Sequence, residues 1–262
     1  MKRHSSVSLG GVRLDGGSHE HIVSQILEWC ASPSFTTRIV TLVNAYSLAS
    51  ALDDPEFHEA LNRADISIPD GAPVAWISRW LSGQRFERFS GPDLMHTLLT
   101  LPDRDSIKHF VYGGSADALD RLELRYNHGM ATVRRRIVGS YAAPFRELSI
   151  EEEQAFKARL EELKPDILWV CLGTARQEKW MARMSHKLNV PVMAGVGAAV
   201  DFLSGTKPRA PRWLQRAGLE WLFRLVTEPR RLWKRYLIGN VIFLRLAVSE
   251  LWQHLSTRRG HA

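Results

Sequence analysis

Short apolar segments alternate with longer amphipathic ones along most of this chain, and that alternation limits the folds it can adopt. The apolar segments typical of strands are residues 38–43, 64–68, 108–113, 132–139, 166–173 and 190–197. Helical patterns lie between them at 45–63 (dividing near Pro55), 73–82, 92–100, 115–128, 149–163 and 176–188. Such alternation indicates βαβ units. The sequence therefore predicts an α/β, Rossmann-like fold, with a mostly parallel sheet and helices on both faces.

The segment before these units has its own pattern. Residues 7–15, "VSLGGVRLD", predict a small hairpin that turns at Gly10-Gly11, and residues 18–30 predict a helix. The basic residues at the start are not followed by an apolar run, so a signal peptide is not expected. The chain has 2 cysteines, each inside an apolar element, which favours a reducing compartment over a disulfide framework.

Polar residues and glycines mark the carboxyl ends of the predicted strands. In parallel α/β sheets, ligands bind in the crevice beyond these ends. Glycines there let a ligand approach the backbone, and helix N-termini behind them can bind phosphate. The alternative is that βα turns need glycine for their own geometry. The marked ends are Asn44, Asp70-Gly71, Gly113-Gly114, Gly173-Thr174, and Gly195 with Gly197.

Four acidic or amide side chains near these ends are candidate site residues. Asp70 follows a short apolar strand in "ISIPDGAPV", which places a carboxylate at the rim of the sheet. Gln177 and Glu178 fall in the first turn of a helix, where the alternative is a helix start stabilised by an early glutamate. Asp201 lies on a short, otherwise apolar helix in "GVGAAVDFLSG", and a solvent-facing carboxylate is the alternative there.

Several familiar chemistries have no matching motif. The turn in "YGGSADALDRL" lacks the three-glycine spacing of a dinucleotide-binding fingerprint, and no P-loop sequence is present. The triplet Asp103-Arg104-Asp105 resembles a metal-holding D-x-D, but it precedes a strand and is expected at the opposite end of the sheet, as a surface loop. His19 and His21 are two residues apart and do not share a helix face. We expect no metal site and no cofactor.

The basic character of the chain belongs to its last segment. The formal net charge is +7, and residues 207–262 contain 12 Lys/Arg against 3 Asp/Glu, or +9, which leaves −2 for residues 1–206. Four of the 9 tryptophans also lie there. The sequence predicts two parts, a Rossmann-like catalytic domain at 1–206 and a helical, membrane-associating appendage at 207–262.

An apolar stripe runs along the predicted helix of this appendage, with basic residues at its start. The apolar stretch 236–248 is interrupted by Asn240 and Arg245, and it would reach only about 20 Å of the roughly 30 Å hydrocarbon core. Such a helix suits a position on the surface of an anionic membrane. The alternative is packing on the main domain or on a second subunit, and nucleic acid fits the stripe poorly. The stripe is Trp233, Leu237, Val241, Leu244, Val248, Leu251 and Leu255.

Several blocks of the sequence together resemble one family. They are "VNAYSLASALDDPEFHEALNRADISIPDGAPVAW", "FVYGG", "CLGTARQEKW", "GVGAAVDFLSG" and "RAPRWLQRAGLEWLFRLVTEPRR", in this order. Over about residues 35–245 they resemble the WecG/TagA/CpsF glycosyltransferases, glycosyltransferase family 26. The resemblance implies sugar transfer, with inversion and without a metal, from a UDP-sugar to a polyprenyl-diphosphate-linked saccharide. It also implies a peripheral place on the cytoplasmic face of the bacterial inner membrane, in cell-envelope or exopolysaccharide biosynthesis.

The resemblance implies roles for individual residues. Asp70 of "PDG" matches the proposed general base. Matches for donor binding are Asn44, Arg88, Gln177 and Asp201, with the turn glycines Gly113, Gly114 and Gly173. Residues expected to contact the membrane or the acceptor are Arg224, Arg230, Arg231, Lys234 and Arg235.

The sequence departs from the family pattern at two places. Leu42 stands where many members have a threonine, and Thr41 is one residue further from the strand end, so that threonine's role is not assigned. "ARQE" replaces the frequent Pro-Lys before the glutamine. The donor sugar stays open between glucose and N-acetylmannosamine types, as do the linkage and a possible homo-oligomer. A non-catalytic nucleotide-sugar or lipid-diphosphate binding subunit is the alternative function, and a nicotinamide-dependent oxidoreductase is disfavoured by the missing fingerprint.

Overall fold

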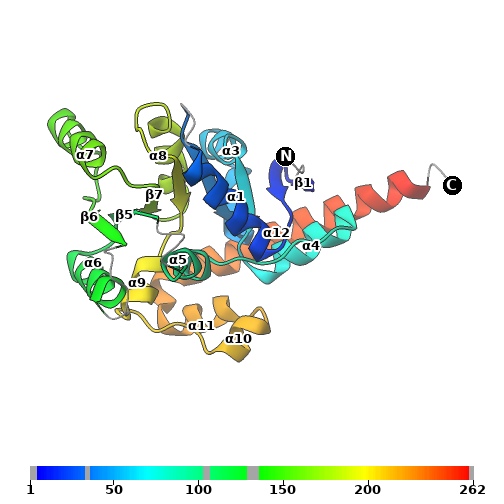
Figure 1. Cartoon of the computed structure of the whole chain (residues 1–262). Helices are drawn as coiled ribbons and strands as arrows, with labels where there is room; N and C mark the ends of the chain where they lie inside the picture. The colour runs from blue at the N-terminus through cyan, green and yellow to red at the C-terminus, as the bar shows by residue number, and fades with distance from the viewer. Residues whose placement is uncertain (1–4, 33–35, 103–106, 129–135, 260–262) are drawn as a thin grey trace.

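A six-stranded parallel sheet forms the centre of the computed structural model (Figure 1). The structure describes residues 5–32, 36–102, 107–128 and 136–259, with side chains described up to residue 256. Its strand order is β4-β3-β8-β7-β5-β6, and each neighbouring pair is parallel. The predicted parallel α/β architecture is confirmed. The strands are β3 (Arg38–Val43), β4 (Ile66–Pro69), β5 (His109–Gly113), β6 (Ile137–Tyr141), β7 (Ile167–Cys171) and β8 (Val192–Gly195).

Helices cover both faces of the sheet because successive strand residues point to opposite sides. Val40 and Leu42 of β3 belong to the core on one face, whereas Ile39 belongs to the core on the other. The first core is completed by α1 (His19–Ala31), α5 (Gly91–Leu99), α6 (Ala116–Glu123) and α9 (Ala199–Ser204). The second is completed by α7 (Ile150–Leu163) and α8 (Arg176–Met184).

The observed elements differ from the predicted ones at a few ends. The strand expected at 132–139 is found at Ile137–Tyr141, after one π-helical turn at Leu124–His128, and residues 129–135 lie outside the described residues. The helix expected to reach residue 188 ends at Met184. The Asp103-Arg104-Asp105 triplet, predicted as a surface loop, also lies outside the described residues.

A third core joins the N-terminal hairpin to the C-terminal helix. The hairpin consists of β1 (Ser6–Leu9) and β2 (Val12–Asp15), as predicted. Its residue Leu9 shares a core with Phe57 and Phe243. At the hairpin turn, the Gly10 N–H donates to Glu250 Oε1 at 3.0 Å. The same core takes in α2 (Ala45–Ala51), α3 (Pro55–Asn62) and α4 (Ala72–Ser82).

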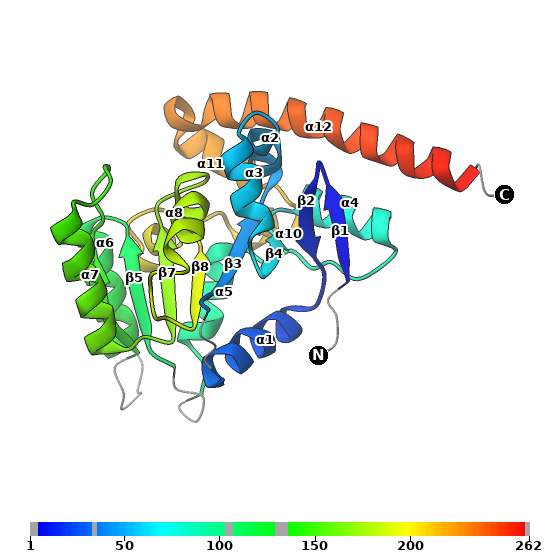
Figure 2. The ribbon, with the colours of Figure 1, turned by 90° about the horizontal axis from the view of Figure 1, so that it is seen from above.

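The residues after 206 are helical: α10 (Arg212–Arg216), α11 (Glu220–Thr227) and the 31-residue α12 (Pro229–Arg259). Figure 2 shows α12 crossing above the carboxyl ends of the strands and projecting past the hairpin. Its inner face packs closely on α2: a Cβ on Gly239 would come within 3.0 Å of the Tyr46 ring. The division at residue 206 stays a prediction.

The opposite face of α12 is apolar and exposed. We call it the outward stripe: Trp233, Leu237, Val241, Leu244, Val248, Trp252 and Leu255, all 45–70% exposed. Leu251, predicted in the stripe, is partly buried instead. The predicted amphipathic helix therefore has one face packed on the protein and the other uncovered. Among the described residues, no helix is long and apolar enough to cross a membrane.

Candidate active site

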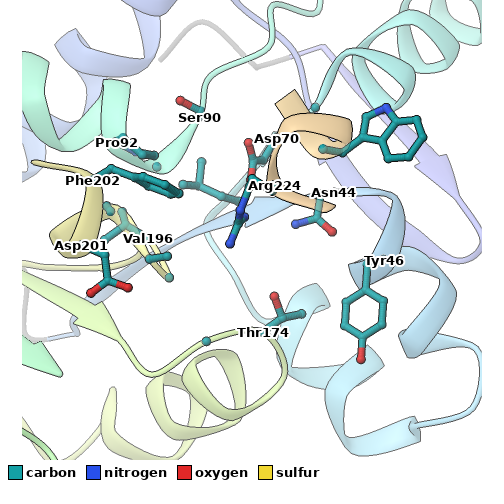
Figure 3. A pocket seen from close by; sticks show the side chains of 18 of the residues that line it. Asn44, Tyr46, Asp70, Ser90, Pro92, Thr174, Val196, Asp201, Phe202 and Arg224 are labelled. Atoms are coloured by element: carbon teal, nitrogen blue, oxygen red, sulfur yellow. The ribbon is translucent and has the colours of Figure 1, made fainter. Parts of the chain in front are cut away.

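A cavity of about 1150 Å³ lies at the carboxyl ends of the strands, under α11 and α12 (Figure 3). The turns after β3, β4, β5, β7 and β8 form its floor, as expected for a parallel sheet. The C-terminal helices form its other wall. Most of the predicted site residues line it: Asn44, Asp70, Arg88, Gly113, Gly114, Gly173, Gln177, Asp201, Arg224, Arg231 and Arg235.

Asp70 stands at the rim because the β3–β4 ladder continues to it. Its N–H donates to the Val43 carbonyl at 2.8 Å, and Gly71, at a φ of 122°, then turns the chain into α4. Burial, and next the nearby Glu220 carboxylate, raise the pKa of Asp70 to about 6, against the opposing effects of Arg88, Arg224 and the Asn44 side chain. Near neutral pH this carboxylate is thus ionised and more basic than an ordinary aspartate.

Asn44 and Arg88 approach Asp70 from two neighbouring segments. Asn44 caps α2, with Oδ1 accepting from the Ser47 N–H at 3.1 Å. Arg88 lies beside β4 because the N–H of the next residue, Phe89, donates to the Pro69 carbonyl at 3.0 Å. Figure 3 shows Asn44, Asp70 and Arg224 gathered in one part of the cavity.

Glu220 connects Arg88 to the C-terminal helices. Its Oε2 lies 3.3 Å from Arg88 Nη2, and its Oε1 lies 3.7 Å from Arg209 Nε. Arg209 Nη2 is also 2.7 Å from Asp93 Oδ2. These ion pairs join α11 to the segments beside β4 and so hold the second wall of the cavity in place. Sequence reasoning missed Glu220, although its "GLEWL" block was recognised.

The glycine turns fit close approach by a ligand. Gly113, Gly114 and Gly173 have φ values of 103°, 90° and 85°, which favour glycine. At Gly113 a Cβ would meet the Cys171 carbonyl oxygen at 2.7 Å, so no larger residue fits. Ser115 then caps α6, its hydroxyl accepting from the Ala118 N–H at 3.3 Å.

Asp201 lies on the α9 side of the cavity, beside Phe202 in Figure 3. Its carboxylate is 3.0 Å from Lys207 Nζ, which is also 3.5 Å from Glu228. The carboxylate therefore already has a cationic partner. Thr41, whose role was left unassigned, is fully buried with its hydroxyl 3.1 Å from that of Ser67, and Leu42 faces the cavity in its place.

The arginines of α11 and α12 bring positive charge into the cavity. Arg235 Nη2 donates to Thr174 Oγ1 at 3.1 Å, and its guanidinium lies 4.4 Å from the Tyr46 ring centre. The guanidinium of Arg224 lies 5.3 Å from the Phe202 ring centre. Nε of each arginine is buried without a hydrogen-bond partner among the described residues. Both arginines line the cavity, so their guanidinium groups place positive charge on its wall.

Two of the five predicted basic residues lie elsewhere. Arg230 and Lys234 are exposed and do not line the cavity, and Lys234 Nζ lies 5.4 Å from the centre of the Trp233 ring. Both belong to the outer surface of α12, next to the outward stripe. As to metals, no group of three or more His, Cys, Asp and Glu side chains in the described parts of the chain is placed to hold an ion.

Comparison of the sequence with known protein families identifies the family of this chain. The family model for the glycosyl transferase WecG/TagA/CpsF family matches residues 7–257. The chain belongs to this family. The suspected resemblance is thereby confirmed, and the matched region includes the cavity and both of its walls.

Three curated relatives carry the same name, N-acetylglucosaminyldiphosphoundecaprenol N-acetyl-β-D-mannosaminyltransferase. The one from Bacillus subtilis is 26% identical over 199 residues, which cover 76% of this chain and 75% of the relative. That from Bacillus spizizenii is 29% identical over 71% of this chain and 70% of the relative. That from Staphylococcus aureus is 24% identical over 88% of this chain and 87% of the relative.

Proposed function

We propose that this protein transfers a sugar from a UDP-sugar to a polyprenyl-diphosphate-linked saccharide, with inversion, and with Asp70 as the general base. One observation carries the proposal: an ionisable carboxyl group with a pKa raised to about 6 faces a cavity that Arg224 and Arg235 also line. A base and an anion site are the two requirements of such a transfer. Membership of the family and the names of the relatives support the same reaction class.

In the proposed step, Asp70 takes up one proton while one bond forms and one breaks at the donor sugar. The carboxylate removes the proton from the attacking hydroxyl of the acceptor sugar, whose oxygen forms a bond to the anomeric carbon of the donor. The bond from that carbon to the diphosphate oxygen breaks, and its electron pair leaves with UDP. Attack from the face opposite the leaving group inverts the anomeric centre. A base within hydrogen-bond reach of the hydroxyl contributes about 10²–10⁴-fold to the rate.

The leaving diphosphate needs positive partners that are already in place. Arg224 and Arg235 both line the cavity, and Arg235 also reaches the β7–α8 turn at Thr174. Donors fixed in advance stabilise the developing charge without further reorganisation. We therefore assign the diphosphate to the space between these arginines and the glycine turns at 113–114 and 173.

The outward stripe and the cavity share one residue, and this shared edge supports a lipid-borne acceptor. Leu244 lines the cavity and is also 63% exposed within the stripe. Arg230 and Lys234 are exposed beside the stripe, where they could contact anionic headgroups. We propose that α12 lies on the cytoplasmic face of the bacterial inner membrane, so that the sugar-diphosphate head enters the cavity while the polyprenyl chain stays in the lipid.

The experiment that tests this function is a transfer assay with defined donors. Purified protein is incubated with polyprenyl-diphosphate-N-acetylglucosamine and either UDP-N-acetylmannosamine, the sugar named in the relatives, or UDP-glucose. We expect UDP release that depends on the acceptor, and a product whose anomeric configuration is inverted relative to the donor. Activity in EDTA tests the metal-independence that the resemblance implies. Tight binding of UDP without turnover of any donor would instead support the non-catalytic binding subunit.

A further inference from the structure

A buried carboxyl group lies directly behind the cavity and is not one of its lining residues. Glu178, in the first turn of α8, is only 2% exposed. Its Oε1 accepts from Gln177 Nε2 at 2.8 Å. Its Oε2 has no hydrogen-bond partner among the described residues. A carboxyl group is costly to bury in this way, so its presence calls for an explanation beyond helix capping.

Gln177 connects this carboxyl group to a different turn. The Gln177 Oε1 accepts from the Gly197 N–H, in the turn between β8 and α9, at 3.0 Å. Both ends of its amide are therefore engaged within the protein. The chain Glu178–Gln177–Gly197 thus links the start of α8 to the β8–α9 turn, and both turns line the cavity.

The backbone on either side is shaped to accommodate this link. At Gly195, a Cβ would lie 3.0 Å from Gln177 Nε2 and 2.7 Å from Met181 Cε, so a larger residue would push against the amide where it lies on the end of β8. At the other end, Ala175 has a φ of 70°, which is unfavourable for alanine. The Ala175 N–H interacts with the Glu178 carboxyl group, which helps to hold that strained turn.

The pKa of Glu178 is set by burial and by the groups around its carboxyl. Burial raises its pKa to about 7, and Arg235 of α12 is the cationic side chain whose charge opposes this rise. On the same helix, Lys179 is engaged with Asp54 and Glu56. The Gln177 hydrogen bond favours the carboxylate and lowers this pKa, but the carbonyl oxygen of a neutral glutamic acid can accept it too. The link therefore requires an acceptor oxygen at residue 178.

We propose that Glu178 is a positioning residue for donor binding: through the Gln177 amide it fixes the β7–α8 and β8–α9 turns relative to one another. This inference rests on the proposed function, because it assigns these two turns to the nucleotide diphosphate. It changes the expected role of Gln177, whose Oε1 and one N–H are used to hold the turns together. Glu178 itself touches no substrate.

The test compares two variants of equal length. Glu178→Gln keeps an acceptor oxygen for Gln177, whereas Glu178→Met fills the same space without one. Affinity for UDP is measured by calorimetry at pH 7.5, and hydrogen exchange is followed in peptides spanning residues 195–198. We expect Glu178→Met to weaken UDP binding about tenfold, in line with the loss of one buried hydrogen bond, and to speed exchange at 195–198. Glu178→Gln should restore most of the affinity and the exchange protection.

Two further variants complete the design. Glu56→Ala removes an exposed contact that also anchors α8, without touching the link, and should match the wild type in both measurements. Gly195→Ala displaces the Gln177 amide from the other side, and it should weaken UDP binding as Glu178→Met does. Melting temperatures separate a local effect from general unfolding, because a merely destabilised protein would exchange faster throughout.

The outcomes distinguish this inference from the proposed function. If the wild type binds UDP and Glu178→Met binds it equally well, with unchanged exchange at 195–198, the positioning role is wrong. Equal defects in Glu178→Gln and Glu178→Met would also overturn it, because the acceptor oxygen would then not matter. A wild-type protein that binds neither UDP nor a UDP-sugar would overturn the proposed function, and this inference with it.

Discussion

The two walls of the cavity are built in different ways. The floor comes from strand ends, where backbone ladders fix Asp70 and the glycine turns, and Arg88 and Arg176 also line it. The other wall comes from α11 and α12, which contribute Arg224, Arg231 and Arg235. The sheet thus supplies the proposed base, and the C-terminal helices add positive charge from the opposite side.

The contrast extends to how each wall is held. Strand ends are fixed by the main chain, whereas α11 is held by the ion pairs of Glu220 with Arg88 and Arg209, and α12 by packing on α2 and the hairpin. Changes at Asp70 should therefore affect the chemical step, and changes on the helical wall should affect donor binding and membrane attachment. Four predictions test this division, from the largest effect to the smallest.

Replacing the base should abolish chemistry while leaving the helical wall intact. We expect Asp70→Asn to lower kcat by about 10²–10⁴-fold, because the amide cannot accept the hydroxyl proton, with little change in the dissociation constant for UDP. Steady-state transfer assays and calorimetry measure the two quantities. Asp53→Asn, at an exposed position after α2, is the control. A kcat within threefold of the wild type would remove Asp70 from the mechanism.

Removing a cavity arginine should affect the donor more than the acceptor. Arg224→Gln loses a charge-assisted contact to the diphosphate, and we expect kcat/KM for the UDP-sugar to fall about 10–100-fold. Arg216→Gln, on the exposed surface of α10, is the matched control and should behave as the wild type. An equal loss in both variants would mean that only the overall positive charge of the appendage matters.

Charging the outward stripe should separate membrane attachment from catalysis. The double variant Leu237→Glu/Val248→Glu places carboxylates at exposed positions that do not line the cavity. Binding to vesicles containing anionic lipid should weaken about tenfold or more in sedimentation assays, while turnover of a short-chain, water-soluble acceptor should change little. Ile150→Glu, at an exposed apolar position on α7, is the control. Equal loss of vesicle binding and soluble turnover would make the stripe part of the fold.

The smallest effect is on stability, and its sign follows from the pKa of Asp70. This pKa is raised from 3.8 to about 6, so the folded protein holds the proton more tightly than the unfolded chain does. Stability therefore falls as the pH rises from about 4 to 6, and the whole penalty remains at pH 7.5. At one pKa unit per about 1.4 kcal/mol, it amounts to at most about 3 kcal/mol.

Asp70→Asn should accordingly raise the melting temperature at pH 7.5 by a few degrees, and by less at pH 5. Differential scanning calorimetry at the two pH values measures this difference. A lower melting temperature at pH 7.5 would mean that the carboxylate stabilises the fold, which would contradict the raised pKa.

Local sequence patterns predicted the floor of the cavity better than its helical wall. Strand periodicity and a following glycine were enough to place Asp70 and Gly113 at the sheet rim, because both signals are local. The contact of Glu220 with Arg88 spans 132 residues and depends on how α11 packs over the sheet. No local pattern contains that information.

The basic cluster of α12 shows the same limit. Arg230 and Lys234 are four residues apart and share a helix face, as do Arg231 and Arg235. The sequence does not show which of these two pairs faces the cavity. The packing of Leu232, Phe243 and Ala247 on the body of the protein sets the rotation of the helix. It places Arg231 and Arg235 at the cavity, with Arg235 partly buried and Arg231 more exposed.

The pH dependence of kcat/KM tests the central claim most directly, because this ratio reports ionisations of the free enzyme. With Asp70 as the base, activity should rise with pH along an acid limb with an apparent pKa near 6. Glu220→Gln removes a charge that raises this pKa and frees Arg88, which lowers it, so the limb should move to lower pH. An acid limb that is absent between pH 5 and 7, or unmoved in Glu220→Gln, would contradict the assignment of Asp70 as the base.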